Sequence, residues 1–182
     1  MLLSPTDTHH PAMLETKEYT LSFHGHSADP ILFILTDNAL PPSFSNQALQ
    51  MALKRNYQLI IAKAHSSASP STLKQKQLKQ QCELHYILQE LPVKPALLVL
   101  GNQTEQALMY TKNGSAHLIT ALILQSRTRS LISQKVINSS LIPTMEIQAH
   151  CDTQQCANNL LRNVMNDTLN FLDQRLALGL PT

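Results

Sequence analysis

Glycine, aromatic residues and charge are all scarce in this chain of 182 residues. It has four glycines, at positions 25, 101, 114 and 179, no tryptophan, and only 4% aromatic residues. Phosphate-binding loops of the G-x-G-x-x-G or Walker type need several glycines close together, so the sequence excludes both motifs and predicts no nucleotide cofactor. Few aromatic side chains and a net charge of +2 without a long basic run argue against nucleic-acid binding.

Charged residues make up only 14% of the chain, although 43% of its residues are hydrophobic. The hydrophobic share is typical of a globular protein with a real core. The polar surface must therefore be built largely from Gln, Asn, Ser and Thr. A surface with so little charge repels its neighbours weakly, which suits a chain that binds a protein partner. A general compositional habit of the source explains the same numbers equally well.

Long apolar runs are also missing. The longest, such as 31–35 and 96–100, are too short to cross a bilayer, so we expect no membrane span. The first residues lack the charged and apolar regions of a signal peptide. Cys82, Cys151 and Cys156 are an odd number of cysteines, which is typical of reduced thiols. These features together predict a cytoplasmic protein.

Short apolar runs alternate with helical patterns along most of the chain. Residues 1–16 have no periodicity and are interpreted as a loose N-terminal arm, and 17–182 as a single α/β domain. An edge strand is expected at 19–23, and buried strands at 30–36, 57–64, 96–100, 118–124 and 144–148. Helices are expected at 44–56, 71–91, 103–112, 128–136 and 153–178.

Strands that are apolar throughout, each followed by a helix, indicate a mostly parallel sheet covered on both faces. No linker, repeat or low-complexity segment divides the chain. The sequence therefore predicts a three-layer α/β sandwich.

Two short motifs carry a family resemblance. The strand at 96–100 runs through Gly101 straight into a helix, and the segment 101–105, Gly-Asn-Gln-Thr-Glu, is similar to the G-x-S-x-G nucleophile elbow. The segment 142–152 is similar to the I-P-T-L-x-I-x-G-x-x-D stretch, with Asp152 in the place of the acidic residue. By these motifs the chain resembles the α/β-hydrolase superfamily, and most closely its bacterial members of unassigned function. The resemblance implies a reduced α/β-hydrolase-like fold.

The sequence departs from the family pattern at the positions on which catalysis depends. Gln103 stands in the place of the serine, and a carboxamide has no ionisable nucleophile. Glu105 replaces the second glycine, and no residue matches the family's histidine because a single helix follows Asp152. Gly101, Gln103, Glu105 and Asp152 are therefore interpreted as a vestigial elbow and acid, and the chain as a pseudoenzyme.

Ligands of such folds bind at the carboxyl ends of the parallel strands. Here this crevice would be lined by polar residues that follow the predicted strands, namely Asp37, Asn38, His65, Asn102, Gln103 and Asp152. They could bind a small polar molecule or only satisfy the backbone of the loops. His150, Cys151, Asp152 and Cys156 lack a second ligand pair, so no metal site is predicted.

Three hypotheses follow, in descending order. The first is a non-catalytic adaptor or subunit of a bacterial protein assembly, whose partner is one or more proteins. The second is a small-ligand binder that uses the crevice at the strand ends. The third is a hydrolase with an unorthodox nucleophile, for which Cys151 with His150 and Asp152 is the remaining candidate.

Overall fold

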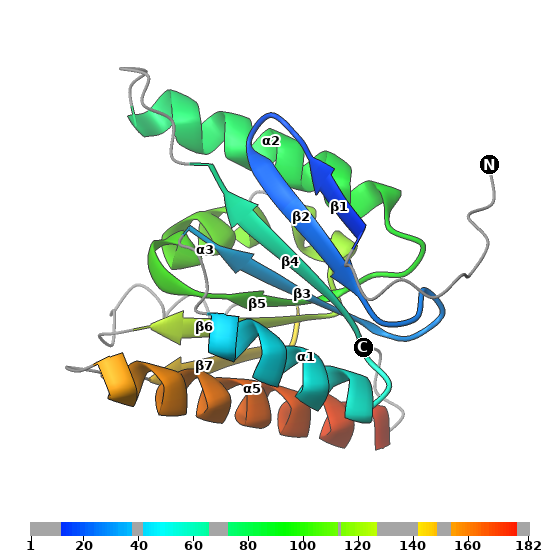
Figure 1. The fold of residues 1–182 in the computed structure, drawn as a ribbon. Coiled ribbons are helices and arrows are strands. Elements are labelled where there is room, and N and C mark those ends of the chain that lie inside the picture. Colours follow the sequence, from blue (N-terminus) through cyan, green and yellow to red (C-terminus); the bar gives the residue numbers. More distant parts are fainter. Residues whose placement is uncertain are drawn as a thin grey trace.

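Seven strands form one mixed sheet that lies between two layers of helices (Figure 1). The computed structural model describes residues 12–37, 42–65, 73–112, 114–126, 142–148 and 154–177. The strands are β1 (Ala12–Glu15), β2 (Tyr19–His24), β3 (Ile31–Thr36), β4 (Gln58–Ala64), β5 (Ala96–Val99), β6 (Ala121–Ser126) and β7 (Thr144–Gln148). Their spatial order is β1-β2-β4-β3-β5-β6-β7. Strands β4, β3, β5, β6 and β7 run parallel, whereas β1 and β2 are antiparallel to their neighbours.

The helices are α1 (Pro42–Lys54), α2 (Leu73–Glu90), α3 (Thr104–Lys112) and α5 (Gln154–Ala177). Two short 3₁₀ turns, η1 (Gly101–Gln103) and η2 (Ser115–Leu118), precede and follow α3. Helices α1 and α5 lie side by side on the front face of the sheet in Figure 1, and α2 and α3 lie behind it. The predicted three-layer α/β sandwich with a mostly parallel sheet is therefore confirmed.

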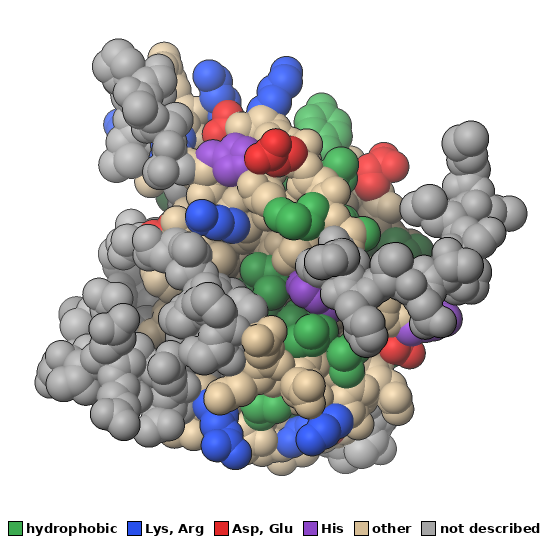
Figure 2. Space-filling model, viewed as in Figure 1, with side chains coloured by type: hydrophobic (Ala, Val, Ile, Leu, Met, Phe, Trp, Pro, Cys, Tyr) green, Lys and Arg blue, Asp and Glu red, His purple; other side chains and the backbone are tan. Residues whose placement is uncertain are grey.

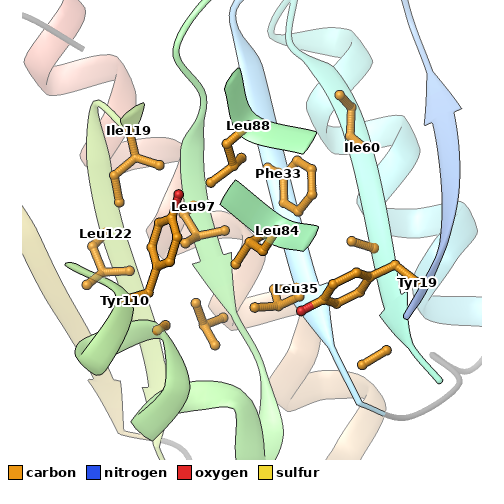
Figure 3. Close-up of a cluster of buried hydrophobic side chains, with 14 of the residues drawn as sticks. Tyr19, Phe33, Leu35, Ile60, Leu84, Leu88, Leu97, Tyr110, Ile119 and Leu122 are labelled. Atoms are coloured by element: carbon orange, nitrogen blue, oxygen red, sulfur yellow. The ribbon is translucent and has the colours of Figure 1, made fainter. Parts of the chain in front are cut away.

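The central strands form two cores because their side chains alternate between the faces of the sheet. In β3, Phe33 and Leu35 point toward α2 and α3, and Leu32 and Ile34 point toward α1 and α5. Every residue of β3 is buried, as the unbroken apolar run predicts. Figure 3 shows the first of these cores, in which Leu84 and Leu88 of α2 cover the middle strands.

The N-terminal region differs from the prediction. Ala12–Glu15, expected to belong to the loose arm, form strand β1, so Tyr19–His24 is an inner strand and not the edge strand. All four β1 residues are exposed, which explains why their sequence shows no apolar alternation. Their strand conformation comes from pairing with β2 across a turn in which the Thr16 amide donates to the Tyr19 carbonyl.

Several boundaries also shift, because local backbone conformations end the elements. Helix α1 ends at Lys54, and Asn56 then adopts a left-handed φ of 56°. Helix α3 begins at Thr104 because η1 takes up the preceding residues. Strand β6 begins at Ala121 and not at 118, because η2 follows the left-handed Gly114. The helix predicted at 128–136 lies outside the described residues.

No helix among the described residues has both the length and the apolar character that crossing a membrane requires.

Candidate functional site

The turn between β5 and α3 is the part of the structure that corresponds to the predicted elbow. Leu100 continues the strand in an extended conformation, with φ −114° and ψ 142°, and its amide donates to the Leu35 carbonyl at 2.9 Å. Gly101 then adopts a left-handed φ of 73° and starts the η1 turn. A residue with a side chain is strained in this conformation, so the abrupt change from strand to helix depends on glycine here.

Asp37 fills the space directly beside Gly101. The two residues lie level because the β3–β5 register pairs Leu35 with Val99, two positions earlier on each strand. A Cβ atom added to Gly101 would lie 2.7 Å from Oδ1 of Asp37, closer than real Cβ contacts occur. Gly101, at the apex of the turn, has no side chain, and the carboxylate of Asp37, which follows the neighbouring strand β3, occupies the space where one would begin.

Gln125, at the end of β6, holds the other side of the turn. Its Oε1 accepts a hydrogen bond from the Gly101 amide at 3.3 Å. The Thr104 hydroxyl lies 3.2 Å from the Gly101 carbonyl and 3.3 Å from the Gln125 carbonyl, and it can donate its one hydrogen to either. These contacts join the ends of β5 and β6 to the start of α3. The sequence analysis missed Gln125 and Thr104, although a polar residue at the end of an apolar strand was a signal for Gln125.

Gln103 is buried, with a relative exposure of 6%, and its side-chain oxygen Oε1 has no hydrogen-bond partner among the described residues. The motif comparison puts this residue in the place of the serine. In the structure the left-handed residue is Gly101, and Gln103 is the last residue of the η1 turn. Because the serine of an elbow is exposed on a strained turn, Gln103 differs from it in conformation, exposure and chemistry.

The structure brings only part of the predicted crevice together. His65 is turned toward β2, where its Nε2 lies 2.8 Å from the Thr20 hydroxyl and its Nδ1 lies 3.1 Å from the Lys17 carbonyl. Strand β3 lies between β4 and β5, so this imidazole belongs to a different part of the sheet edge from Gly101.

The other predicted residues are placed only in part. Asn102 lies in η1 and Glu105 in the first turn of α3, and only their backbone is described. Asn38, His150, Cys151 and Asp152 lie outside the described residues. The predictions that involve their side chains stay predictions. Within the described ranges no three His, Cys, Asp or Glu side chains gather in a group that could hold a metal ion.

The described side chains around the turn provide polar atoms, of which a carboxylate and a hydroxyl are of a type that can attack a substrate. The described side chains around the turn are a carboxylate, two carboxamides and a hydroxyl, those of Asp37, Gln103, Gln125 and Thr104. The Thr104 hydroxyl is directed to main-chain carbonyls rather than to a general base. A hydroxyl or thiol nucleophile is activated by a general base within hydrogen-bond reach, whereas a carboxylate such as that of Asp37 can attack without one.

Comparisons with known proteins agree with this geometry at the level of the fold. No protein-family model matches the sequence, and no curated protein is similar to it. A thioesterase domain from the curacin biosynthetic pathway matches with a TM-score of 0.51 at 13% identity, over 72% of this chain and 52% of the other. Epoxide hydrolase A from Mycobacterium thermoresistibile matches with a TM-score of 0.51 at 10% identity, over 71% and 44% of the two chains.

An epoxide hydrolase from an endophytic Streptomyces matches with a TM-score of 0.51 at 12% identity, over 66% and 38%. The chain thus spans about half the length of these structures or less. Identities this low describe the fold and carry no activity with them. The sheet order, the helical layers and these matches together show that the chain has an α/β-hydrolase-like fold.

Proposed function

We propose that this protein is a non-catalytic α/β-hydrolase-like protein that acts as an adaptor or subunit of a bacterial protein assembly. One observation carries the proposal: the apex of the β5–α3 turn is Gly101, and Oδ1 of Asp37 lies where a side chain at this position would begin. A nucleophile built at the apex would have to displace a carboxylate. The negative charge would also oppose an oxyanion that developed beside it.

The composition of the surface supports the adaptor role. Charged residues make up 14% of the chain, so repulsion between this surface and a partner is weak. The proposed location is the cytosol, since the cysteines are odd in number and Cys82 carries an exposed free thiol. The structures that match are named as a thioesterase and epoxide hydrolases, and hydrolysis is the activity that a test must exclude.

Two measurements on the purified full chain test the proposal. The first treats it with a serine-directed fluorophosphonate and a thiol-directed probe, together with simple acyl esters and an epoxide. We expect no turnover that survives repurification and no labelling that Cys151→Ala removes. Turnover by the wild type that Asp37→Ala or Cys151→Ala abolishes would overturn the non-catalytic assignment.

The second measurement isolates the tagged protein from its own host and determines the stoichiometry of the complex by sizing and mass spectrometry. We expect a partner at fixed stoichiometry that stays bound in salt and is unaffected by Gln103→Ala. A monomer without partner would overturn the adaptor role.

A small-ligand binder remains the second candidate, because no described residue donates to the buried Oε1 of Gln103. Buried acceptors are normally satisfied, and a ligand that enters from the strand ends could supply the missing hydrogen bond. This candidate predicts that a metabolite raises the melting temperature of the wild type and not of the Gln103→Met variant. A shift that is equal in both proteins would exclude Gln103 as its site.

A further inference from the structure

Helices α1 and α5 present two facing rows of polar side chains on the front of the molecule. On α1 the row is Asn46, Gln50 and Lys54, and on α5 it is Arg162, Asn166 and Asn170. Each row repeats every four residues, so its members lie above one another on one side of the helix, and all six residues are exposed. The two helices run side by side in the same direction (Figure 1), so the rows lie along one another.

A groove of about 920 Å³ lies between these rows. It is lined by one cation, one thioether and five carboxamides, namely Arg162, Met51, Asn46, Gln47, Gln50, Asn163 and Asn166. None of these described lining residues carries a carboxylate or an aromatic ring. The lower part of Figure 2, where these helices lie, shows basic side chains (blue) among tan surface, with a few hydrophobic side chains (green).

Arg55 fixes one end of the groove. Its guanidinium bridges from the end of α1 to α5 and donates to Oδ1 of Asn170 at 2.8 Å, to Oδ2 of Asp173 at 2.9 Å and to Oδ1 of Asn166 at 3.2 Å. A guanidinium is only a donor, so the oxygen of the Asn166 carboxamide must be the atom that faces it. The NH₂ group of Asn166 is then left to donate to a ligand in the groove.

The charges around the groove favour a ligand that is an acceptor and an anion. Asp173 is neutralised by Arg55. Arg162 forms no ion pair with any Asp or Glu in the part of the chain that the structure describes. Lys54, in the last turn of α1 at the same end as Arg55, adds a second positive charge away from Arg162. A carboxylate would therefore meet cations and a preset amide donor, and charge-assisted hydrogen bonds of this kind are the strong ones.

We propose that the α1–α5 groove binds an extended acidic segment of a partner protein, with Arg162 as its anchor and Lys54 at its far end. The inference rests on the proposed function, for which it names the interaction surface. Arg55, the neighbour of Lys54 in the sequence, donates to Asn170, which lies eight residues beyond Arg162 on α5. At 1.5 Å per residue we expect the two cations to be about 12 Å apart along the helices. An extended peptide advances about 3.3 Å per residue, so acidic side chains four positions apart match this spacing.

The chemistry of the lining favours a peptide over a nucleic acid. Single-stranded nucleic acids bind through stacking of their bases on aromatic side chains, and none is among the described residues that line the groove. Carboxamides instead match peptide groups, because each offers both a donor and an acceptor.

The test measures fluorescence polarisation of a labelled peptide with two glutamates separated by three uncharged residues, titrated with the full-length protein. We expect saturable binding that weakens at least tenfold in Arg162→Glu and severalfold in Lys54→Glu. Asn166→Asp replaces the NH₂ donor with an oxygen of nearly the same shape, and we expect severalfold weaker binding. Lys79→Glu makes the same charge change as Lys54→Glu on the exposed side of α2, behind the sheet, and we expect it to leave binding unchanged.

Several outcomes would overturn the inference. The first two are that the wild type shows no saturable binding of the peptide, or that Lys79→Glu weakens binding as much as Arg162→Glu does. The other two are that a peptide with adjacent glutamates binds equally well, or that an RNA oligomer competes more strongly than the unlabelled peptide. Thermal melting of each variant separates loss of binding from loss of folding.

The same variants distinguish this inference from the proposed function. A partner isolated from the host that stays bound to Arg162→Glu refutes the groove and leaves the adaptor role standing. The absence of any partner of the wild type refutes the adaptor role itself.

Discussion

Oδ1 of Asp37 lies against Gly101 at the carboxyl end of the sheet, so close that a Cβ at this position would force the carboxylate to shift. A Cβ on Gly101 would come within 2.7 Å of that oxygen. The parallel register of β3 and β5 places the two residues level, although 64 positions separate them in the sequence. This relationship makes the apex of the turn unlike that of a nucleophile elbow. The loss of stability caused by a side chain at position 101 can be measured.

Gly101→Ala is expected to destabilise the protein by more than the backbone strain alone. A left-handed conformation costs about 1–2 kcal/mol for a residue with a Cβ, and here the new Cβ must also displace Asp37. Urea denaturation measures the loss in the free energy of unfolding.

Gly114→Ala is the matched control, because Gly114 has a similar φ of 92° and nothing within 4 Å of its would-be Cβ. We expect the Gly101 variant to lose more stability than the Gly114 variant. Adding Asp37→Ala to Gly101→Ala is expected to cost less than the sum of the two single changes, because the clash is then absent. Strict additivity would contradict the contact.

Gln103→Met is expected to leave stability unchanged or to raise it by up to about 1 kcal/mol. The substitution keeps the shape of the side chain and removes a buried oxygen that has no partner, and an unsatisfied buried polar group typically costs about 1–3 kcal/mol. Gln103→Ala controls for lost packing and is expected to be less stable than Gln103→Met. A marked loss in the Met variant would mean that the carboxamide already has a partner within the protein, which would remove the basis of the ligand-binding candidate.

Tyr57→Phe is expected to destabilise the protein by about 1 kcal/mol, the usual net worth of one hydrogen bond. The Tyr57 hydroxyl donates to Oδ1 of Asp173 at 3.0 Å, while Arg55 holds the other oxygen of the same carboxylate. Asp173→Ala removes both contacts, so we expect a larger loss in the free energy of unfolding than in Tyr57→Phe. The Arg55 and Asp173 side chains are partly exposed, so we expect the ion pair itself to contribute little and its share to shrink in salt. Chemical denaturation at low and high salt measures both effects.

Alkaline pH is expected to unfold the protein from about pH 10 upward. Burial raises the pKa of Tyr110 from 10.0 to about 12, although the hydrogen bond with Ser115 opposes the shift. Burial also raises the pKa values of Tyr19 and Tyr57. A pKa that is higher in the folded state stabilises the fold below pH 10, and this contribution is lost as the pH rises toward 12.

Tyr110→Phe removes one of these groups, so we expect stability to fall less steeply with pH in the variant. Denaturation between pH 9 and 11 measures the slope, and the ultraviolet absorbance of tyrosinate follows the ionisation. Equal slopes in wild type and variant would mean that Tyr110 ionises alike in the folded and unfolded chains.

The sequence by itself determined the class of the fold. Runs such as Ile31–Leu35 and Ala96–Val99 are apolar at every position, and only a sheet covered on both faces buries such strands completely. It also located the turn at Gly101, because an apolar strand followed directly by a helical pattern must turn at the glycine between them. It did not indicate β1, since exposed residues gain strand conformation only from the partner strand.

Only the tertiary structure decided what surrounds the turn and what the helices offer to a partner. Asp37, Gln125 and Gly101 come from three strands, and strand order and register, which short sequence patterns do not encode, bring them together. The α1–α5 groove likewise exists because Ala48 and Met165 pack the two helices onto the same face of the sheet. In the sequence their rows of carboxamides lie more than 100 residues apart, and packing alone makes them the walls of one groove.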